Sequence, residues 1–395
     1  MYNSIKIDLE PYTSVTVSSL KEVDDLLEDV LSLDFQLQPR IIDKPVILYG
    51  AGSLGKMARD FFTYLKIPFL YIVDKNANQN KKDESWKNID IVHPDEVEET
   101  HKKNNLLVIC VVTTPFIPLR DELKNNGWED IAFFYDISQA YCDRHPLNNG
   151  WFLGKLNDND KESIRKVFSL FADDVSRSYY VQFITWRKLR TELLFSDLEI
   201  NNDNRFFIPE ITNVLREDEI FLDCGAHKGS VIEKYLKLVN KDYKEIWAIE
   251  PDPLNIDALK TRLVNKPNIH VINHALSNKN GKEKFYQGFN FASKLSENGN
   301  DIIDITKLDR LNIAATFIKM HLEGGELNAI TGAQKTIKEN RPIIAITLYH
   351  NSDGVWRIIL FLMNLLENYC FHFRLHSWAG TGAVLYAIPI ERNKW

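Results

Sequence analysis

The chain has 395 residues, of which 44% are hydrophobic and 26% are charged, an ordinary globular composition. Its length predicts two domains and a connector, because one core seldom serves so long a chain. The formal net charge of −7 argues against a nucleic-acid-binding protein. The longest apolar runs, residues 106–112 and 358–366, are too short to span a membrane.

The four cysteines of the chain are far apart in the sequence and form no C-x-x-C pair. Cysteines used in this way are typical of a reducing compartment. Residues 1–12 also lack the continuous apolar core of a signal peptide. We therefore expect a cytoplasmic protein.

The first 140 residues predict a helical segment followed by an α/β domain. Residues 1–44 are amphipathic around 20–33, which indicates a helix used for packing or for forming a homo-oligomer. In residues 45–140, helical stretches separate apolar strands that show no alternation, a pattern that predicts a parallel sheet covered on both faces. The expected strands read VILYG, FLYIVD, IDIVHP, LLVICVVTT and IAFFYDI.

A glycine turn follows the first of these strands. Gly50, Gly52 and Gly55 come directly after it, and Asp74 closes the next strand nineteen residues beyond Gly55. This is the context of a dinucleotide or nucleotide-sugar turn. Bound NAD(P), another nucleotide or nucleotide-sugar, and a structural or substrate-presenting domain without ligand all remain open.

Residues 141–216 are rich in aromatics and helix formers, and they predict a helical connector with a long helical run through Leu194. No plausible acid–base pair occurs in them, which argues against hydride transfer. The basic cluster at residues 187–190 predicts either a solvated helix face or a salt-bridge partner.

The α/β alternation starts again at about residue 217. The expected strands read FLDCG, IWAIE, HVINHA, FIKMHLE and IIAITLY, followed by FHFRLHS and AVLYAIP. The last two strands have no helical stretch between them, so they can pair as a hairpin. The segment 217–395 therefore predicts a second parallel sheet that ends in an antiparallel hairpin.

A second glycine turn, built from Asp223, Gly225 and Gly229, ends the first strand of this segment, and Glu250 ends the next strand. A carboxylate at the position of Glu250 can accept hydrogen bonds from two ribose hydroxyls. S-adenosylmethionine (SAM) fits better than NAD, because the turn lacks the third closely spaced glycine that seats a pyrophosphate. The alternative is an α/β crossover without nucleotide.

Several stretches of the second half occur in the order found in a known family. They are DDVSRSYY (173–180), FLDCGAHKGS (221–230), AIEPDP (248–253), NHALSNKNG (273–281), FIKMHLEGGELNAITGA (317–333), IIAITLYH (343–350) and VLYAIP (384–389). Over about residues 170–390 the chain resembles the FkbM-type SAM-dependent methyltransferases, and residues 45–140 look like the Rossmann-type domain that precedes some of them. The resemblance implies a class I methyltransferase fold and O-methylation of a sugar, glycan or related metabolite, in bacterial polysaccharide biosynthesis.

The resemblance also implies roles for individual residues. Asp223, Gly225 and Gly229 would line the methionine and ribose portion of SAM, and Glu250 would hold the ribose hydroxyls. Three residues after the third strand would border the adenine: Asn273, His274 and Ala275. Two positions depart from the family: His321 stands where an acid is usual at the end of the fourth strand, and residues 380–383 lack the usual acid and threonine.

Methyl transfer to a hydroxyl needs an aligned acceptor oxygen and a base for its proton. His321 and His350 follow the fourth and fifth strands, at the sheet edge where α/β proteins place ligands, and Glu323 and Glu326 follow at the same edge. We expect His321, His350 and Glu323 to be catalytic; the alternative is ordinary hydrogen bonding at strand ends. The three could also converge on a metal, but their scatter in the sequence forms no metal motif, so we assign no metal ligands. Two residues on FHFRLHS are candidates for gripping a charged or glycan substrate: Arg374 and His376.

The sequence thus predicts an α/β protein with two Rossmann-like parallel-sheet domains joined by a helical connector. The predicted segments are a helical N-terminal segment (1–44), a small Rossmann-like domain (45–140), the connector (141–216) and a SAM-dependent methyltransferase domain (217–395). We expect a small-molecule or glycan substrate, no nucleic acid and no membrane span. Two alternatives stay open: an NAD(P)-dependent oxidoreductase using the first glycine turn, and a non-catalytic assembly protein with a decayed methyltransferase fold.

Overall fold

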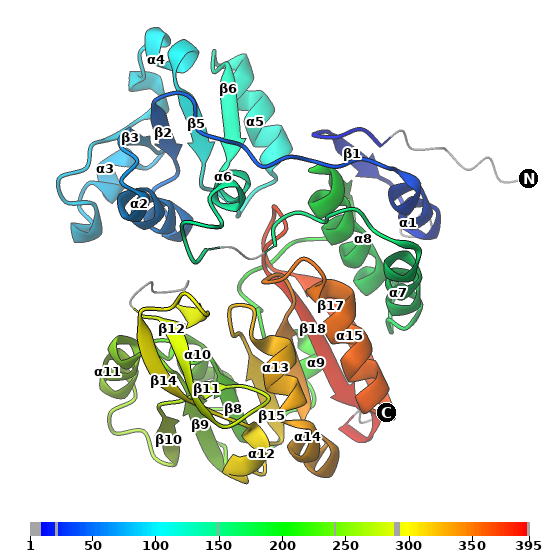
Figure 1. Ribbon diagram of the computed structural model, residues 1–395. Helices are drawn as coiled ribbons and strands as arrows, with labels where there is room; N and C mark the ends of the chain where they lie inside the picture. Colours follow the sequence, from blue (N-terminus) through cyan, green and yellow to red (C-terminus); the bar gives the residue numbers. More distant parts are fainter. Residues whose placement is uncertain (1–8, 20–22, 148–149, 241, 288–292, 393–395) are drawn as a thin grey trace, which may run out of the picture. The chain divides into compact units, whose positions relative to one another are not determined.

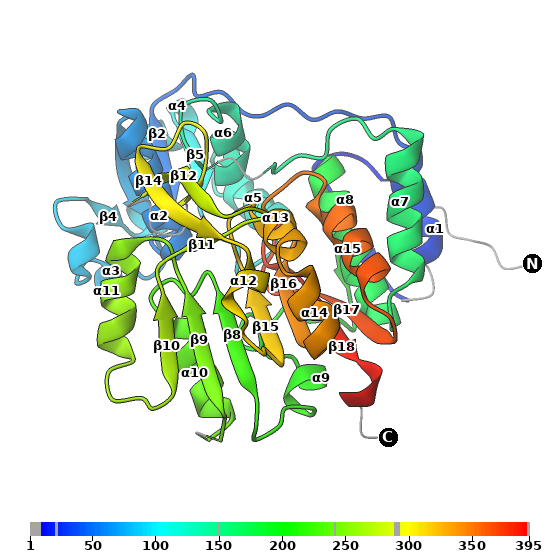
Figure 2. The same cartoon turned by 60° about the horizontal axis from the view of Figure 1, so that its bottom comes forward.

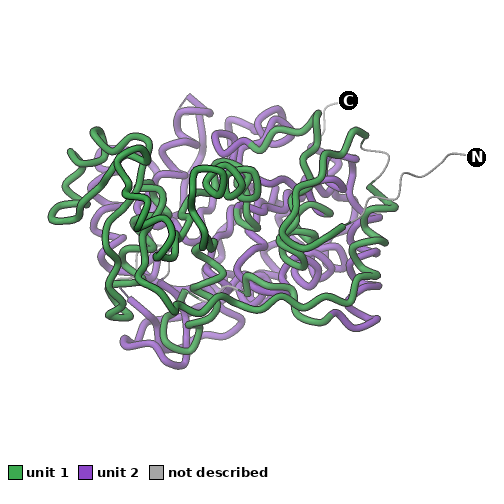
Figure 3. The backbone as a smooth tube through the Cα atoms, turned by 90° about the horizontal axis from the view of Figure 1, so that it is seen from above, with its two compact units in different colours: residues 1–155, 181–200, 377–381 green, residues 156–180, 201–376, 382–395 purple. Residues whose placement is uncertain are grey.

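A computed structural model describes residues 9–19, 23–147, 150–240, 242–287 and 293–392. The chain divides into two compact units (Figure 3). Unit 1 comprises residues 1–155, 181–200 and 377–381, and unit 2 comprises residues 156–180, 201–376 and 382–395. Residues 141–216 are shared between the two units, and the boundaries of the four expected segments stay a prediction.

Unit 1 contains a five-stranded parallel sheet with strand order β4-β3-β2-β5-β6 (Figure 1). This confirms the parallel sheet expected from unalternating apolar strands. The first strand, β2, lies between β3 and β5. The chain continues from β2 toward β3 and β4 on one side and later adds β5 and β6 on the other, so the sheet has a switch point beside β2. The strands are β2 (Val46–Tyr49), β3 (Phe69–Val73), β4 (Ile91–Val92), β5 (Leu106–Ile109) and β6 (Asp130–Phe133).

The helices of this sheet are α2 (Ser53–Leu65), α3 (Ala77–Asn80), α4 (Glu99–Asn104), α5 (Phe116–Asn125) and α6 (Phe134–Ala140). One expectation is wrong here. The apolar run IAFFYDI leaves the sheet after Phe133, and its second half forms the start of α6. Phe134 and Ile137 are both buried there, so the apolar residues serve a helix face as well as a strand.

Unit 1 also holds a two-stranded parallel sheet, in which β1 (Ser14–Val17) pairs with β7 (Glu192–Phe195). The expected helical run through Leu194 is therefore wrong. Helix α8 (Asp174–Leu189) ends before Arg190, whose φ of +57° breaks the helix and allows the strand to begin. The amphipathic helix expected around residues 20–33 is confirmed by α1 (Val23–Ser32), which buries its apolar side.

The basic cluster at residues 187–190 lies inside the protein, so a solvated helix face is excluded. Arg187 and Arg190 are fully buried. The guanidinium of Arg190 forms an ion pair of 2.8 Å with the carboxylate of Asp136. A buried charge of this kind needs such a partner, and the salt-bridge alternative holds for Arg190.

Unit 2 is built on a seven-stranded sheet with the order β10-β9-β8-β15-β16-β18-β17 (Figure 2). Five strands are parallel, and β18 pairs antiparallel with both β16 and β17, which confirms the expected hairpin. The strands are β8 (Ile220–Cys224), β9 (Glu245–Ile249), β10 (Ile269–Ile272), β15 (Phe317–Met320), β16 (Ile343–Thr347), β17 (Tyr369–Leu375) and β18 (Ala383–Pro389).

Both faces of this sheet are buried. Alternate strand residues such as Phe221, Phe317 and Ile343 join a core cluster with Ile232 and Tyr235 of α10. Their sequence neighbours point to the opposite face and are buried as well. The helices of unit 2 are α7 (Asp158–Ser169), α9 (Pro209–Thr212), α10 (Ser230–Leu238), α11 (Pro253–Arg262), α12 (Leu308–Leu311), α13 (Glu326–Thr331), α14 (Gln334–Asn340) and α15 (Gly354–Leu365).

A second, smaller sheet of unit 2 was not expected. Its strand order is β11-β14-β12-β13, with bounds Ala275–Leu276 (β11), Gly281–Tyr286 (β12), Lys294–Leu295 (β13) and Asp301–Thr306 (β14). In Figure 2 these strands lie above the carboxyl ends of β8, β9 and β10. Within the described ranges, every helix is too short or too polar to cross a lipid bilayer.

Candidate functional site

The candidate site of unit 2 lies at the switch point of the seven-stranded sheet, where β8 has β9 on one side and β15 on the other. The glycine turn begins at Gly225, with a φ of +76°, and ends at Gly229, with a φ of +82°. A Cβ atom on Gly225 would lie 2.0 Å from the carbonyl oxygen of His321. Gly225 is needed for two reasons: its φ is positive, and the chain that follows β15 passes too close to leave room for a side chain.

A buried ion pair lies directly beneath this turn. Asp223 and Lys319 are register partners on β8 and β15, and the Lys319 Nζ lies 2.7 Å from Asp223 Oδ1. The same ammonium donates to the carbonyl oxygen of Gly225 over 2.8 Å. Burial raises the pKa of Asp223, and the charge of Lys319 opposes the rise. Among the residues that the structure describes, Asp223 Oδ2 has no hydrogen-bond partner.

Glu250 follows β9 and is almost fully buried. Its Oε2 accepts from the backbone N–H of His227 over 2.8 Å, and its Oε1 accepts from the N–H of Asp252 and from the Asn255 side chain over 3.0 and 3.2 Å. Burial raises the pKa of Glu250, and these donors oppose it. A carboxylate offers about four acceptor sites, so one remains for a ligand.

The three residues expected to border the adenine separate into two environments. The Asn273 side chain donates to the carbonyl oxygens of Glu250 and Pro251, over 3.1 and 2.9 Å. His274 instead lines a cavity of about 450 Å³ together with residues of β12, β14 and α12. Ala275 opens β11 and is buried. Asn273 therefore lies beside the Glu250 turn, and contact with an adenine stays a prediction for all three.

The structure brings the three expected catalytic side chains together. The Nε2 atoms of His321 and His350 are 2.9 Å apart. One carboxylate oxygen of Glu323 lies 3.0 Å from His321 Nε2, and the other lies 3.2 Å from His350 Nδ1. The hydroxyl of Tyr349 is 3.2 Å from the same His321 nitrogen. We call these four residues the His321 cluster.

The His321 cluster is largely shielded from solvent. The exposed fractions of the His321, Glu323 and His350 side chains are 20%, 14% and 3%. Burial lowers the pKa of His321 well below its ordinary value of 6.5, and the neighbouring charges of Arg205 and Lys319 lower it further. Burial likewise raises the pKa of Tyr349 to about 12. The Tyr349 hydroxyl accepts a hydrogen bond of 2.8 Å from Arg205.

Glu326 fixes the turn that carries His321 and Glu323. Its carboxylate accepts from the backbone N–H groups of Leu322 and Gly324, both over 3.0 Å, and from the Thr347 hydroxyl over 2.9 Å. Glu326 is fully buried, and burial raises its pKa. Glu326 therefore stabilises the turn after β15, because its carboxylate is hydrogen-bonded to the backbone N–H groups of that turn.

The glycine turn of unit 1 has a similar frame. Gly50 has a φ of +105°, and a Cβ atom on Gly55 would lie 2.0 Å from the Gly50 carbonyl oxygen. Asp74 accepts from the N–H of Ala51 through Oδ2 and from the N–H of Asn76 through Oδ1, both over 2.7 Å. Gly52 differs, because its φ is −76° and a Cβ atom added to it would have no heavy atom within 4 Å.

Trp86 closes one side of this turn, since its indole N–H donates to the carbonyl oxygen of Ala51 over 3.1 Å. The neighbouring strand end carries Cys110, and burial raises the pKa of its thiol. Two lysines beside this turn, Lys56 and Lys75, form exposed ion pairs with Asp83 and Glu122. Nucleotide binding at Gly50, Gly52, Gly55 and Asp74 stays a prediction.

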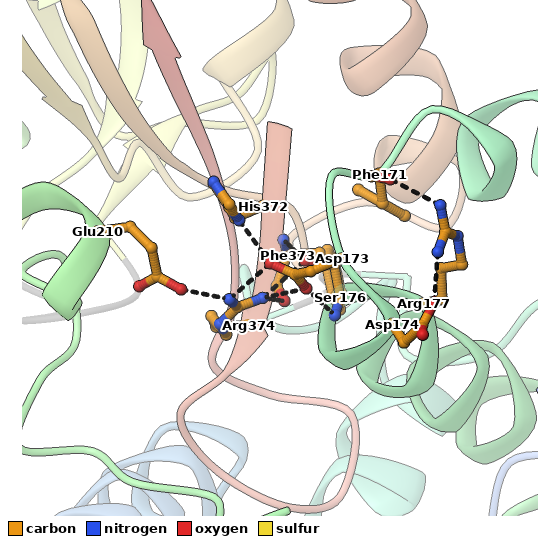
Figure 4. A network of polar contacts seen from close by, with 9 residues as sticks. All are labelled: Phe171, Asp173, Asp174, Ser176, Arg177, Glu210, His372, Phe373 and Arg374. Atoms are coloured by element: carbon orange, nitrogen blue, oxygen red, sulfur yellow. Dashed lines mark hydrogen bonds and ion pairs between the residues drawn. The ribbon is translucent and has the colours of Figure 1, made fainter. Parts of the chain in front are cut away.

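Arg374 and His376 make protein contacts that occupy their polar groups. Figure 4 shows Arg374 between two carboxylates: it donates to Asp173 over 3.0 and 3.1 Å and to Glu210 over 2.6 Å. His372 contacts the same Asp173 over 2.6 Å. His376 lies within hydrogen-bond distance of the Asn201 carbonyl and the Tyr386 hydroxyl. We therefore assign Arg374 to anchoring the start of α8 to β17, in place of the substrate role considered above.

Lys319 and Tyr349 are site residues that were not singled out from the sequence. The signal for Lys319 was present, because a lysine within an otherwise apolar strand needs a buried partner. Tyr349 directly precedes His350, so its position at the strand end was also open to prediction. Arg205 gave no comparable signal, because it lies more than a hundred residues away in the sequence.

Comparison with known proteins identifies a domain in this part of the chain. Residues 223–373 match the methyltransferase FkbM domain family. A solved methyltransferase FkbM from Methylobacillus flagellatus KT is similar at 17% sequence identity and a TM-score of 0.65, covering 93% of this chain and 100% of that one. An rRNA methylase from Streptococcus thermophilus has 14% identity and a TM-score of 0.30, covering 45% of this chain and 89% of that one. No curated protein matches the chain.

Proposed function

Residues 223–373 form an FkbM methyltransferase domain, and we propose that it transfers the methyl group of SAM to a hydroxyl of a sugar, glycan or related metabolite. The observation that carries the proposal is the meeting of His321, His350 and Glu323 at the carboxyl edge of the sheet, beside the glycine turn of β8. Atoms that can accept a proton and a turn that suits a nucleoside therefore lie at the same edge of the sheet.

Two buried carboxylates fit SAM. Asp223 Oδ2 lacks a hydrogen-bond partner among the described residues, and Glu250 keeps one acceptor site after its three protein donors. An oriented carboxylate of this kind suits the ammonium and hydroxyl groups of SAM better than it suits phosphates. We place one ribose hydroxyl on Glu250 and the methionine portion near Asp223, where SAM supplies an electrophilic methyl group.

The His321 cluster is our site for the acceptor oxygen. A sugar hydroxyl is a weak acid, so its proton must be removed as the oxygen attacks the methyl carbon. Two imidazoles and a carboxylate supply proton-accepting atoms, and Glu326 holds two of these side chains in place through the turn. The resemblance to FkbM-type enzymes supports a sugar or glycan acceptor, a cytoplasmic reaction and a place in bacterial polysaccharide biosynthesis.

SAM affinity measured by calorimetry tests the cofactor placement. Glu250→Gln removes a charge-assisted hydrogen bond worth about 1.5–3 kcal/mol, so we expect binding weaker by about 10- to 100-fold. Asp74→Asn is the matched control, because Asp74 occupies the corresponding place in unit 1. Equal SAM affinity in Glu250→Gln and the parent would contradict the placement.

Methyl transfer itself is tested by incubating the protein with SAM and a panel of nucleotide sugars and glycans. We expect mass spectrometry to find one added methyl group on a hydroxyl oxygen of the product. We also expect His321→Ala and His350→Ala to lower turnover by about 10²–10⁴ while both variants still bind SAM. Transfer only to carbon or nitrogen atoms, or turnover within a few-fold of the parent in both variants, would refute the proposed reaction.

A further inference from the structure

The side chains of His321, His350 and Glu323 converge more closely than hydrogen bonding alone explains. Three polar atoms surround His321 Nε2: His350 Nε2 at 2.9 Å, Glu323 Oε1 at 3.0 Å and the Tyr349 hydroxyl at 3.2 Å. A single imidazole nitrogen carries either one proton or one lone pair, so it makes one good hydrogen bond. The remaining contacts bring electron-rich atoms together.

We propose that these side chains bind a divalent first-row transition metal ion, with His321, His350 and Glu323 as its ligands. Two imidazoles and one carboxylate are a donor set that such ions bind with positions left open. Adjacent ligand atoms around an octahedral ion lie about 3 Å apart when each is about 2.1 Å from the metal. The observed separations of 2.9 and 3.0 Å agree with that geometry.

The surroundings favour a transition metal over Mg²⁺ or Ca²⁺. Arg205 donates to Tyr349 at the edge of the cluster, and the ammonium of Lys294 acts electrostatically on Glu323. These positive charges weaken the attraction for an ion held mainly by charge. Imidazole nitrogens suit zinc, copper, iron or nickel, whereas hard cations prefer an all-oxygen ligand set.

The backbone around the ligands is held in place by other groups. The N–H of His321 donates to the carbonyl oxygen of Cys224 over 3.0 Å. Glu323 itself adopts a φ of +50°, and Glu326 accepts from the N–H groups on either side of it. The turn therefore presents the Glu323 carboxylate toward His321 in a fixed geometry, as a metal site requires.

The second cluster with metal-type side chains provides a contrast. Asp173, Glu210 and His372 also lie close to one another. There the guanidinium of Arg374 lies between the two carboxylates and binds both of them (Figure 4). In the Asp173 cluster the guanidinium of Arg374 thus takes the place that a metal ion would have. This cluster serves as the internal control for the His321 cluster.

The role of the metal rests on the proposed function, whereas its binding does not. The His321 and Glu323 side chains are partly exposed, so an acceptor hydroxyl can approach the open positions. A metal held by these side chains would make them ligands and no longer proton acceptors. It would lower the pKa of the acceptor hydroxyl, whose proton would pass to water. The oxygen then forms a bond to the methyl carbon of SAM as the carbon–sulfur bond breaks, with its electron pair going to sulfur. The products are a methyl ether and S-adenosylhomocysteine.

The test uses full-length protein without an affinity tag, stripped by a chelator and then titrated with Co²⁺, Mn²⁺ and Zn²⁺. We expect one equivalent to bind and the Co²⁺ absorption spectrum to show nitrogen and oxygen ligation. Glu323→Gln and His350→Ala should weaken binding by about 100-fold or more, whereas His372→Ala in the Asp173 cluster should bind as the parent does. Thermal melting and SAM titration check that each variant is folded.

Two results would overturn the metal site: no saturable binding in the parent, or parent-like binding in both ligand variants. Methyl transfer by stripped and reloaded protein separates this proposal from the proposed function. Recovery of turnover on reloading supports the metal, and full turnover in the presence of chelator overturns its catalytic role while leaving methyl transfer intact. Metal binding with no methyl transfer under either condition would refute the proposed function alone.

Discussion

The two units repeat one structural frame around their glycine turns. The N–H of Gly50 donates to the last residue of β3 over 2.8 Å, and the N–H of Gly225 donates to the last residue of β9 over 2.9 Å. The next residue is a carboxylate in both units, Asp74 or Glu250, and each accepts an N–H from its turn and one from two residues ahead. Both acids therefore have the same structural role in their turns, whether or not a ligand binds.

The units differ at the strands beside the turn. Leu48 and Val108 are register partners on β2 and β5, at the places where unit 2 has the ion pair of Asp223 and Lys319. One step further, the N–H of Cys110 donates to β2, just as the N–H of His321 donates to β8. Unit 2 therefore has ionisable groups where unit 1 has apolar residues and a thiol.

A glycine turn followed by an acid and a set of reactive groups are thus separate features of a parallel sheet. A turn followed by an acid arises from the backbone requirements of a parallel sheet, since the carboxylate ties two turns together. The proposed reactive groups come from the ends of the neighbouring strands, which in unit 2 supply the His321 cluster. The chemistry of a turn is therefore best judged from the adjacent strand.

The largest expected effect comes from breaking the ion pair that distinguishes unit 2. Lys319→Met leaves Asp223 buried without its cation, so we expect a loss of about 3–5 kcal/mol in the free energy of unfolding. The double variant Asp223→Leu with Lys319→Val copies the Leu48–Val108 pair of unit 1. It should recover most of the lost stability, because it leaves no unpaired charge.

Chemical denaturation of the parent, the single variant and the double variant measures both effects. SAM titration of the double variant then tests the role of Asp223, because a stable unit 2 without this carboxylate should bind SAM poorly. A loss of under about 1 kcal/mol in Lys319→Met would show that water reaches the pair, and that the two units differ less than their burial indicates.

Unit 1 contains a buried carboxylate that is bound by backbone N–H groups and not by a lysine, and the stability of the protein should depend on pH through it. Glu192 accepts from the N–H groups of Phe116 and Ile117 at the start of α5, and burial raises its pKa from 4.5 to about 7. The folded state thus keeps a proton that the unfolded chain releases. The contribution of Glu192 to the free energy of unfolding should therefore be highest below pH 4.5 and fall by roughly 3 kcal/mol as the pH rises to 7.

The measurement is the pH dependence of unfolding between pH 5 and 8 in the parent and in Glu192→Gln. The glutamine has no proton to lose, so we expect its stability to depend less on pH than that of the parent. Parallel curves for the two proteins would mean that the N–H groups stabilise the charged carboxylate enough to cancel the effect of burial.

The sequence predicted those parts of the structure that depend on local patterns. Apolar runs located the strands of both parallel sheets, and glycine spacing located both turns. The ends of β15 and β16 were expected to meet, and His321 and His350 do so. The small sheet was missed because β12 and β14 are largely exposed and lack the continuous apolar runs of the buried strands.

The remaining site features depend on contacts between distant residues. The Asp223–Lys319 bond joins residues 96 positions apart, and Thr347 at the end of β16 donates to Glu326 at the start of α13. Pairings of this kind are fixed by strand register, which the sequence of either strand alone does not determine. Arg374 shows the converse error, since an exposed-looking arginine near the end of a strand lies between Asp173 and Glu210.

The smallest expected effect tests whether unit 1 keeps its turn for a ligand. Gly55→Ala places a Cβ atom 2.0 Å from the Gly50 carbonyl oxygen, so it should cost about 1–3 kcal/mol. Gly52→Ala meets no protein atom and needs no positive φ, so it should cost less than about 1 kcal/mol by thermal unfolding. The fold therefore does not require glycine at position 52, and we propose that a ligand of unit 1 would require it. We expect Gly52→Val to abolish any nucleotide bound by unit 1 and to leave the SAM affinity of unit 2 unchanged. Loss of SAM affinity in a folded Gly52→Val protein would show that the two turns do not act independently.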